Sequence, residues 1–101
     1  MIVSGSDDET IRVWDLESGK EACAPITGHT GGVAALAVAE RQGRTVIVSG
    51  SNDRTIRVWD LESGEPSRMI DVGAQVWSIV LVAGSKIVAC TSMGLICIRL
   101  H

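Results

Sequence analysis

Short apolar stretches alternate with clusters of turn-forming residues along the whole chain. Thr45–Ser49 is a β-branched apolar run, which is typical of a strand buried on both faces. Gly50–Arg54 then supplies turn residues. Thr55–Trp59 is again rich in β-branched residues and closes on a large aromatic. This order predicts an antiparallel hairpin.

Two further strands are expected on either side of this hairpin. One follows through Arg68–Val72, and the other precedes the hairpin at Val33–Ala39. The alanines in Val33–Ala39 would also suit half a helix. A strand is favoured because turn residues bound both ends and because the matching stretch Val76–Val82 reads VWSIVLV.

The same unit occurs more than once. Ile2–Gly19 repeats in Ile47–Gly64 with only two changes, from Asp7 to Asn52 and from Glu9 to Arg54. A third and more divergent copy lies at Ile87–Leu100. Self-similarity at a fixed period indicates a repeat architecture, and four short strands per ~40–45 residues are typical of a propeller blade.

The motifs of the complete unit carry a family resemblance. Gly28-His29 precedes a strand, the segment SGSNDRTIRVWD follows it, and the unit ends on Trp59-Asp60. On these residues the chain resembles the WD-repeat β-propeller family over nearly its whole length. The resemblance implies an all-β fold of four-stranded antiparallel blades, here an incomplete ring of about three. It also implies a non-catalytic protein-interaction scaffold.

On this interpretation residues 1–101 form one propeller segment. Residues 1–27 would be a partial blade that lacks its inner strand and includes a strand at about Ala22–Ile26. Residues 28–72 would be a complete blade, and residues 73–101 a degenerate blade without its outer strand. About ten strands are expected.

The family's buried hydrogen-bonded tetrad can be carried over residue by residue. It implies a network of His29, Ser49, Asp53 and Trp59, matched in the first unit by Ser4, Asp8 and Trp14. Physically, a buried imidazole needs a carboxylate, and a buried indole N–H needs an acceptor. In the third unit Val72, Ala89, Met93 and Arg99 stand at these positions, so that blade is expected to hold together by packing alone.

The resemblance also places a partner-binding rim where the loops enter the inner strands. Trp77 is the most informative member, as a rim anchor for a partner or as a side chain that packs the third blade in place of its missing tryptophan. The full rim set is Asp7, Gly32, Ala34, Asn52, Gln75, Trp77 and Ser92.

Composition removes several other classes of function. The net charge is −3 without a basic stripe, so no nucleic-acid partner is expected. The three cysteines lack metal-ligand spacing and suggest free, buried thiols in a reducing cytoplasm. Met1 leads straight into a strand, and no apolar run is long enough for a membrane span. Neither a metal nor a cofactor is expected, because the acidic turn at Asp7–Glu9 recurs with Arg54 and the glycines of Gly28–Gly32 precede no helix.

The Ser, His and Asp of the tetrad are not expected to form a hydrolase triad. The chain contains no G-x-S-x-G elbow, and Ser4-Gly5 recurs as Ser49-Gly50, as a structural repeat would.

Three blades cannot close a ring of ~4–8 blades, so the end sheets need cover. Three explanations stay open: the C-terminal part of a longer propeller, assembly with further copies, or a truncated product without a stable fold. The corresponding functions are an interaction scaffold, a self-assembling unit, or the regulatory tail of a larger signalling protein.

Overall fold

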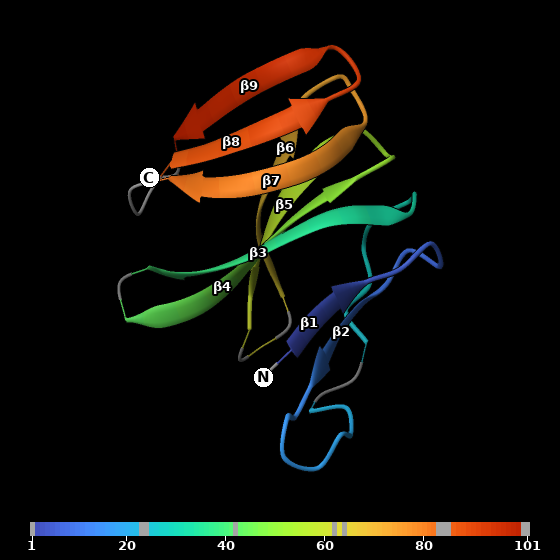
Figure 1. Cartoon of the computed structure of the whole chain (residues 1–101), viewed down its shortest axis with the longest axis vertical. Coiled ribbons are helices and arrows are strands. Elements are labelled where there is room, and N and C mark those ends of the chain that lie inside the picture. Colours follow the sequence, from blue (N-terminus) through green and yellow to red (C-terminus); the bar gives the residue numbers. More distant parts are fainter. Residues whose placement is uncertain are drawn as a thin grey trace.

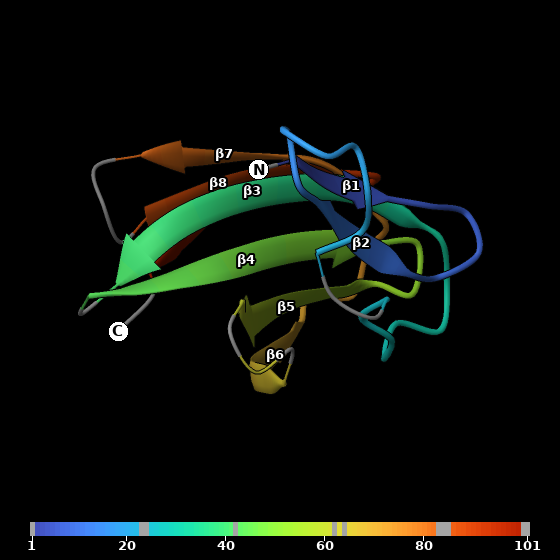
Figure 2. The same ribbon diagram turned by 90° about the horizontal axis from the view of Figure 1, so that it is seen from below.

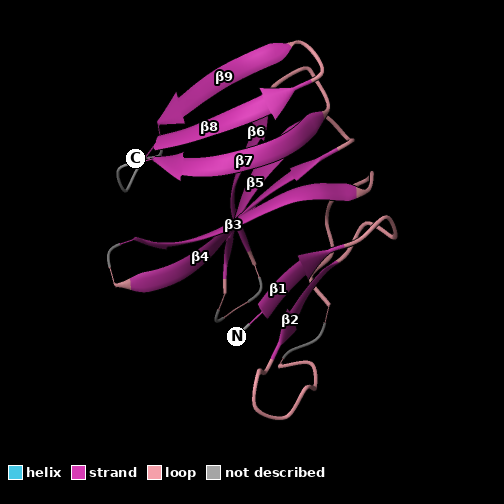
Figure 3. Ribbon diagram, in the orientation of Figure 1, coloured by secondary structure: helices cyan, strands magenta, loops and turns pink. Residues whose placement is uncertain are grey.

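Three antiparallel sheets account for the regular structure in a computed structural model of the chain, which describes residues 2–22, 25–41, 43–61, 63, 65–82 and 86–99. The all-β fold class is thereby confirmed, and the described part contains no helix (Figure 3). Figure 1 shows the sheets side by side in chain order. The first sheet is β1 (Ile2–Gly5) and β2 (Ile11–Trp14), the middle sheet is β3 (Val33–Arg41), β4 (Arg44–Ser51), β5 (Thr55–Asp60) and β6 (Pro66–Asp71), and the third sheet is β7 (Val76–Val82), β8 (Lys86–Thr91) and β9 (Gly94–Arg99).

The middle sheet contains the strands that the pattern predicts. The alanine-rich segment forms β3 and not a helix, and with β4 it makes a long curved hairpin (Figure 2). Residues 46–51 of β4 are buried without alternation because other sheets cover both faces of the strand. Each Val or Ile buried in this way contributes about 1.5–3 kcal/mol relative to exposure.

The cross-strand register assigns the two faces of the middle sheet. Ile47 lies opposite Trp59 on the face toward the first sheet, and Val48 lies opposite Val58 on the face toward the third. Two apolar cores result. The core against the first sheet contains Ile11, Val13, Ile26, Val33, Ile47 and Trp59, and the core against the third contains Ala35, Val46, Val48, Ile56, Val58, Val76, Ile87 and Ala89.

Both junctions between sheets place a valine on a glycine. A Cβ atom on Gly5 would lie 2.6 Å from Cγ1 of Val33, and one on Gly50 would lie 2.3 Å from Cγ1 of Val76. Real Cβ atoms do not approach other atoms this closely, so each glycine allows the first valine of the next inner strand to approach.

The predicted strand at about Ala22–Ile26 does not appear as a strand. Cys23 and Ala24 lie outside the described residues, and the flanking residues pair with β2 through two isolated bridges, Ile11–Ile26 and Trp14–Glu21. The described residues therefore hold nine strands, against about ten expected.

The strand register of the third unit also differs from the register that alignment of the repeats implies. Ile87 pairs with Ile98, whereas the equivalent Ile47 pairs with Trp59, so the β8–β9 hairpin is one residue shorter. Ile98, and not Arg99, therefore takes the place of the repeat tryptophan. Its side chain packs against the core between the middle and third sheets, so an apolar contact stands where the middle sheet has a hydrogen bond.

Candidate interaction surface

The loop before β3 is fixed by the packing of Gly28 and His29 against Trp59. Gly28 has φ 150°, and a Cβ atom there would lie 2.6 Å from Cη2 of Trp59. The rings of His29 and Trp59 meet edge to face at 5.9 Å between centroids, a favourable aromatic arrangement. A glycine followed by a histidine thus allows the loop to lie directly on the indole.

One chain of hydrogen bonds connects the four residues of the tetrad. The Trp59 indole N–H donates to Ser49 Oγ at 2.8 Å, and Ser49 Oγ lies 2.6 Å from His29 Nε2. His29 Nδ1 lies 2.8 Å from Asp53 Oδ2. Every donor meets an acceptor if the imidazole is neutral, carries its proton on Nδ1 and accepts from Ser49 at Nε2. The structure therefore brings all four predicted residues together.

The electrostatics of the network agree with this proton arrangement. Burial lowers the pKa of His29 below its usual 6.5, and the bond to Asp53 offsets only part of that effect. Burial alone would raise the pKa of Asp53. Hydrogen bonds from Thr55, His29 and the Thr30 N–H outweigh burial and lower this pKa to about 2. The stable state is a neutral imidazole beside a carboxylate.

The three units carry this network to different degrees. In the first unit Trp14 Nε1 donates to Ser4 Oγ at 3.0 Å, and Asp8 accepts from the Thr10 N–H at 3.1 Å. The side-chain bond from Thr10 is the main cause of a lowered pKa at Asp8. In the third unit Met93 is 82% exposed, so nothing replaces the aspartate there.

The turn after the first strand of each hairpin contains a residue with positive φ in all three units, although the turn of the third unit is one residue shorter. Glu9 and Arg54 both adopt positive φ, at 74° and 71°, and the corresponding Gly94 has φ 115°. Positive φ costs a residue with a side chain about 1–3 kcal/mol. In the middle sheet the carboxylate of Asp53 holds the turn by accepting from the Thr55 N–H at 3.0 Å.

One hydroxyl position in these turns was missed from the sequence. Ser6, Ser51 and Thr91 each accept a hydrogen bond from the backbone N–H two residues later. Ser51 is fully buried and also donates to the Gly31 and Gly32 carbonyls at 3.0 and 2.9 Å. Comparison of the three copies would have revealed it, because each has a hydroxyl at this place.

The rim residues lie where the turns meet the starts of the inner strands, on the right in Figure 1. Ala34 and Trp77 occupy equivalent β-bulges, since the register shifts between Val33 and Ala35 and between Val76 and Ser78. A bulge turns its extra residue out of the ladder. The Trp77 side chain is 53% exposed and is not part of either core.

The other rim residues form two groups. Around the first junction, a Cβ atom on Gly32 would lie 3.2 Å from Oδ1 of Asp7 and 3.6 Å from Nδ2 of Asn52. Around the third sheet, the Ser92 N–H donates to the Gln75 carbonyl at 3.0 Å and Ser92 Oγ accepts from the Gln75 N–H at 3.2 Å. Trp77 follows directly after this second group.

Comparison with known proteins places the chain in a family. The family model described as the WD domain, G-beta repeat matches residues 1–15 and 21–60. The chain belongs to the WD-repeat family. The family of the sequence-based resemblance is therefore confirmed.

Individual proteins of known sequence or structure give local and fold-level matches. The chain is 54% identical over 39 residues to the pre-mRNA-splicing factor PRP46 of Debaryomyces hansenii, a match that covers 39% of the chain and 9% of that protein. The WD40 β-propeller domain of Doa1 matches 94% of the chain and 31% of its own length, at TM-score 0.83 and 27% identity. The computationally designed Ika4 protein matches 98% of the chain and 59% of its own length, at TM-score 0.81 and 29% identity.

Within the described ranges, no group of three or more His, Cys, Asp or Glu side chains is placed to hold a metal ion. No helix in the same ranges is long and apolar enough to cross a bilayer.

Proposed function

We propose that this WD-repeat segment is a non-catalytic scaffold that binds other proteins through its rim. The observation that carries the proposal is the exposed indole of Trp77, which a β-bulge turns outward at the start of β7. Tryptophan is enriched among the few residues that dominate binding energy at protein interfaces. The network of His29, Ser49, Asp53 and Trp59 supplies a rigid support for the adjacent loops.

The absence of catalysis is inferred from the environment of Ser49. The distances from Ser49 to His29 and from His29 to Asp53 resemble those of a hydrolytic triad. However, Ser49 has no exposed surface, and its oxygen accepts the Trp59 N–H, so a substrate carbonyl cannot reach it. An esterase-type activity that the His29→Ala substitution abolishes would contradict this proposal.

The partner is proposed to be a protein in a reducing compartment, with the cytoplasm as the expected location. Cys90 and Cys97 are free thiols, but the expectation that they are buried is wrong, because Cys97 is exposed and Cys90 is only half-buried. The net charge of −3 disfavours nucleic acid and anionic lipid as partners. A fluorescent fusion that enters the secretory pathway would contradict this location. The likeness to a splicing factor covers a single repeat, and we infer no splicing role from it.

The rim is tested by capture with matched variants. Trp77→Ala removes the anchor, and Met69→Ala removes a similarly exposed apolar side chain (57% against 53%) on the outer strand of the middle sheet. Proteins retained from a lysate by wild type and by Met69→Ala, but lost with Trp77→Ala, support the rim. Equal capture by all three forms would refute Trp77 as an anchor.

A second candidate function is self-assembly. It is favoured by the face of the third sheet that points away from the middle sheet, where Val80, Leu95 and Cys97 are exposed. A role as the regulatory tail of a larger signalling protein has no such supporting contact, although the chain spans only part of the length of its relatives.

A further inference from the structure

The outer face of the third sheet is defined here as the side of β8 and β9 that is turned away from the middle sheet. Ala89 and Ile96 form a cross-strand pair whose side chains point inward to the core. Because side chains alternate along a strand, the neighbouring pairs on either side point outward. Leu95 is 73% exposed and Cys97 is also exposed. In cross-strand pairs this face consists of Cys90 with Leu95, Val88 with Cys97, and Lys86 with Arg99.

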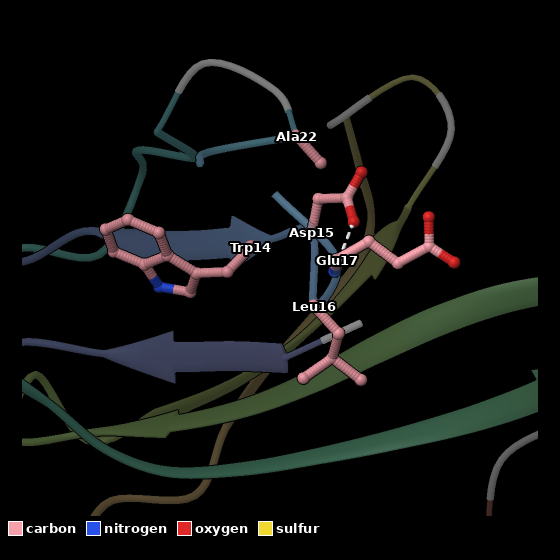
Figure 4. A pocket seen from close by; sticks show the side chains of 5 residues that line it. All are labelled: Trp14, Asp15, Leu16, Glu17 and Ala22. Carbon is pink, nitrogen blue, oxygen red and sulfur yellow. Dashed lines mark hydrogen bonds between the residues drawn. The ribbon is translucent and has the colours of Figure 1, made fainter. Parts of the chain in front are cut away.

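The first sheet has a corresponding outer face at the other end of the molecule, formed by Ser4, Arg12, Trp14 and Leu16. Trp14 is the counterpart of Trp59, yet it is only half-buried, whereas Trp59 is buried by the first sheet. Leu16 is 63% exposed, whereas its counterpart Leu61 packs against the core. Figure 4 shows the hollow beside these side chains, lined by Trp14, Asp15, Leu16, Glu17 and Ala22.

The two internal junctions show how such faces meet. In each, the far side of one sheet receives the near side of the next, and a valine at the start of the inner strand sits on a glycine. If a further sheet stacked in the same way, the outer face of the third sheet would contact a surface like the outer face of the first. Both surfaces belong to this chain, at opposite ends.

Cys90 determines which kind of sheet the third sheet accepts. It stands where Gly50 stands in the middle sheet, because Ile87 and Ile47 begin the two repeats. A following sheet with an inner-strand valine would therefore place that valine against the Cys90 side chain. The outer face of β1 and β2 carries Ser4, Arg12 and Trp14 and presents no valine, so it does not make this contact with Cys90.

The two outer faces also carry opposite charges at one end of their strands. Lys86 begins β8 and Arg99 ends β9, and they lie opposite each other at the edge of the outer face. Asp15 and Glu17 lie beside Trp14 at the equivalent end of the first sheet, whereas Arg12 is already paired with Glu21 at 2.7 Å. Opposite charges thus face each other when the sheets stack in the same direction as within the chain.

We propose that the outer face of the third sheet binds the outer face of the first sheet of a second copy, in a closed head-to-tail dimer. This inference rests on the self-assembly candidate and is independent of binding at the rim. The described residues form three sheets, so two copies of them give six and three copies give nine. Only the dimer falls within the usual ring of ~4–8 blades.

The mass in solution, measured by light scattering, tests the joint. Leu95→Glu places a charge in the proposed joint, and Met69→Glu places one on another exposed apolar site outside it. Wild type and Met69→Glu should have twice the mass of the chain. Leu95→Glu should raise the dimer dissociation constant roughly ten- to hundred-fold and keep its β-type circular dichroism.

The possible results separate the joint from self-assembly itself. A folded wild-type monomer, or a polydisperse series of larger species, would overturn self-assembly and leave the rim proposal untouched. A discrete dimer that Leu95→Glu does not weaken would overturn this joint alone.

A charge exchange provides an independent test that does not depend on loss of apolar contact. Glu17→Lys and Lys86→Glu should each raise the dimer dissociation constant about two- to five-fold, and the double variant should restore it. Additive weakening in the double variant would contradict the proposed orientation of the two sheets.

Discussion

Gly50 lies so close to Val76 that an added Cβ atom would stand 2.3 Å from the valine Cγ1. The same relationship joins Gly5 to Val33 at the first junction, at 2.6 Å. The distance between neighbouring sheets is therefore set by one glycine and one valine at each of the two junctions. This contact explains why the repeat keeps a glycine in the interior of a strand, where glycine is otherwise unfavourable.

The first prediction concerns this contact. Gly50→Ala should lower the free energy of unfolding by about 1–3 kcal/mol, because the added methyl group overpacks a tight junction. Adding Val76→Ala should relieve the clash, so the double variant should lose less than the sum of the two single losses. Urea denaturation of the four forms measures this coupling, and strict additivity would contradict the contact.

The second prediction concerns the hydrogen-bond network. Ser49→Ala leaves the Trp59 N–H and His29 Nε2 buried without their partner, and should cost about 2–4 kcal/mol of stability. Ser4→Ala is the matched control, because the Ser4 hydroxyl accepts from the Trp14 N–H at a half-buried site of the first unit, and that unit has no histidine in the described residues. It should cost about 1 kcal/mol or less. Equal losses of stability in the two variants would show that the network of the middle sheet contributes no more than the single bond of the first sheet.

The third prediction concerns pH. The pKa of His29 is lowered in the folded state, so the folded protein resists protonation that the unfolded chain accepts. Stability from this group is complete above pH 6.5 and is lost as the pH falls through the lower folded pKa. The pKa of Asp53 falls from 3.8 to about 2, so its contribution is lost between these values.

The midpoint of urea denaturation should therefore decline in two stages on acidification, first below pH 6.5 and again below pH 3.8. His29→Gln should remove the first stage and keep part of the second. A variant profile that still declines from pH 6.5 like the wild type would assign that stage to another group.

The fourth prediction concerns the β8–β9 turn. Gly94 has φ 115°, a conformation that residues with a side chain rarely adopt. Gly94→Ala should lower stability by about 1–3 kcal/mol, although a Cβ atom there meets no neighbour within 4 Å. An unchanged thermal midpoint would show that this turn relaxes without cost.

Much of the fold could be predicted from the sequence because the same pattern of strands and turns occurs in two nearly identical copies. Strands of β-branched residues between fixed turns predicted the sheets, and the alanine-rich β3 was recognised from its counterpart β7. The register of β9 could not be predicted in this way. A sequence alignment without gaps assumes that the turns of the two hairpins have the same length. The β8–β9 turn, closed by Thr91 and Gly94, is one residue shorter, so Ile98 and not Arg99 lies opposite Ile87.

The site was predicted unevenly for a similar reason. The motif identified His29, Ser49, Asp53 and Trp59, which the structure brings together. It did not reveal Ser51, whose buried hydroxyl ties the turn to the Gly31 and Gly32 carbonyls. Trp77 illustrates a different limit. No pattern in the sequence distinguishes an exposed tryptophan at a bulge from a packed one, and its role in binding stays a prediction.

The most direct measurement for the account as a whole is hydrogen exchange at the indole N–H groups of the three tryptophans, followed by nuclear magnetic resonance. The repeat tryptophan Trp59 is expected to exchange slowly, because its N–H is buried and bonded to Ser49. Trp77 should exchange at nearly the rate of a free indole. A strongly protected Trp77 together with a freely exchanging Trp59 would contradict both the internal network and the exposed rim anchor.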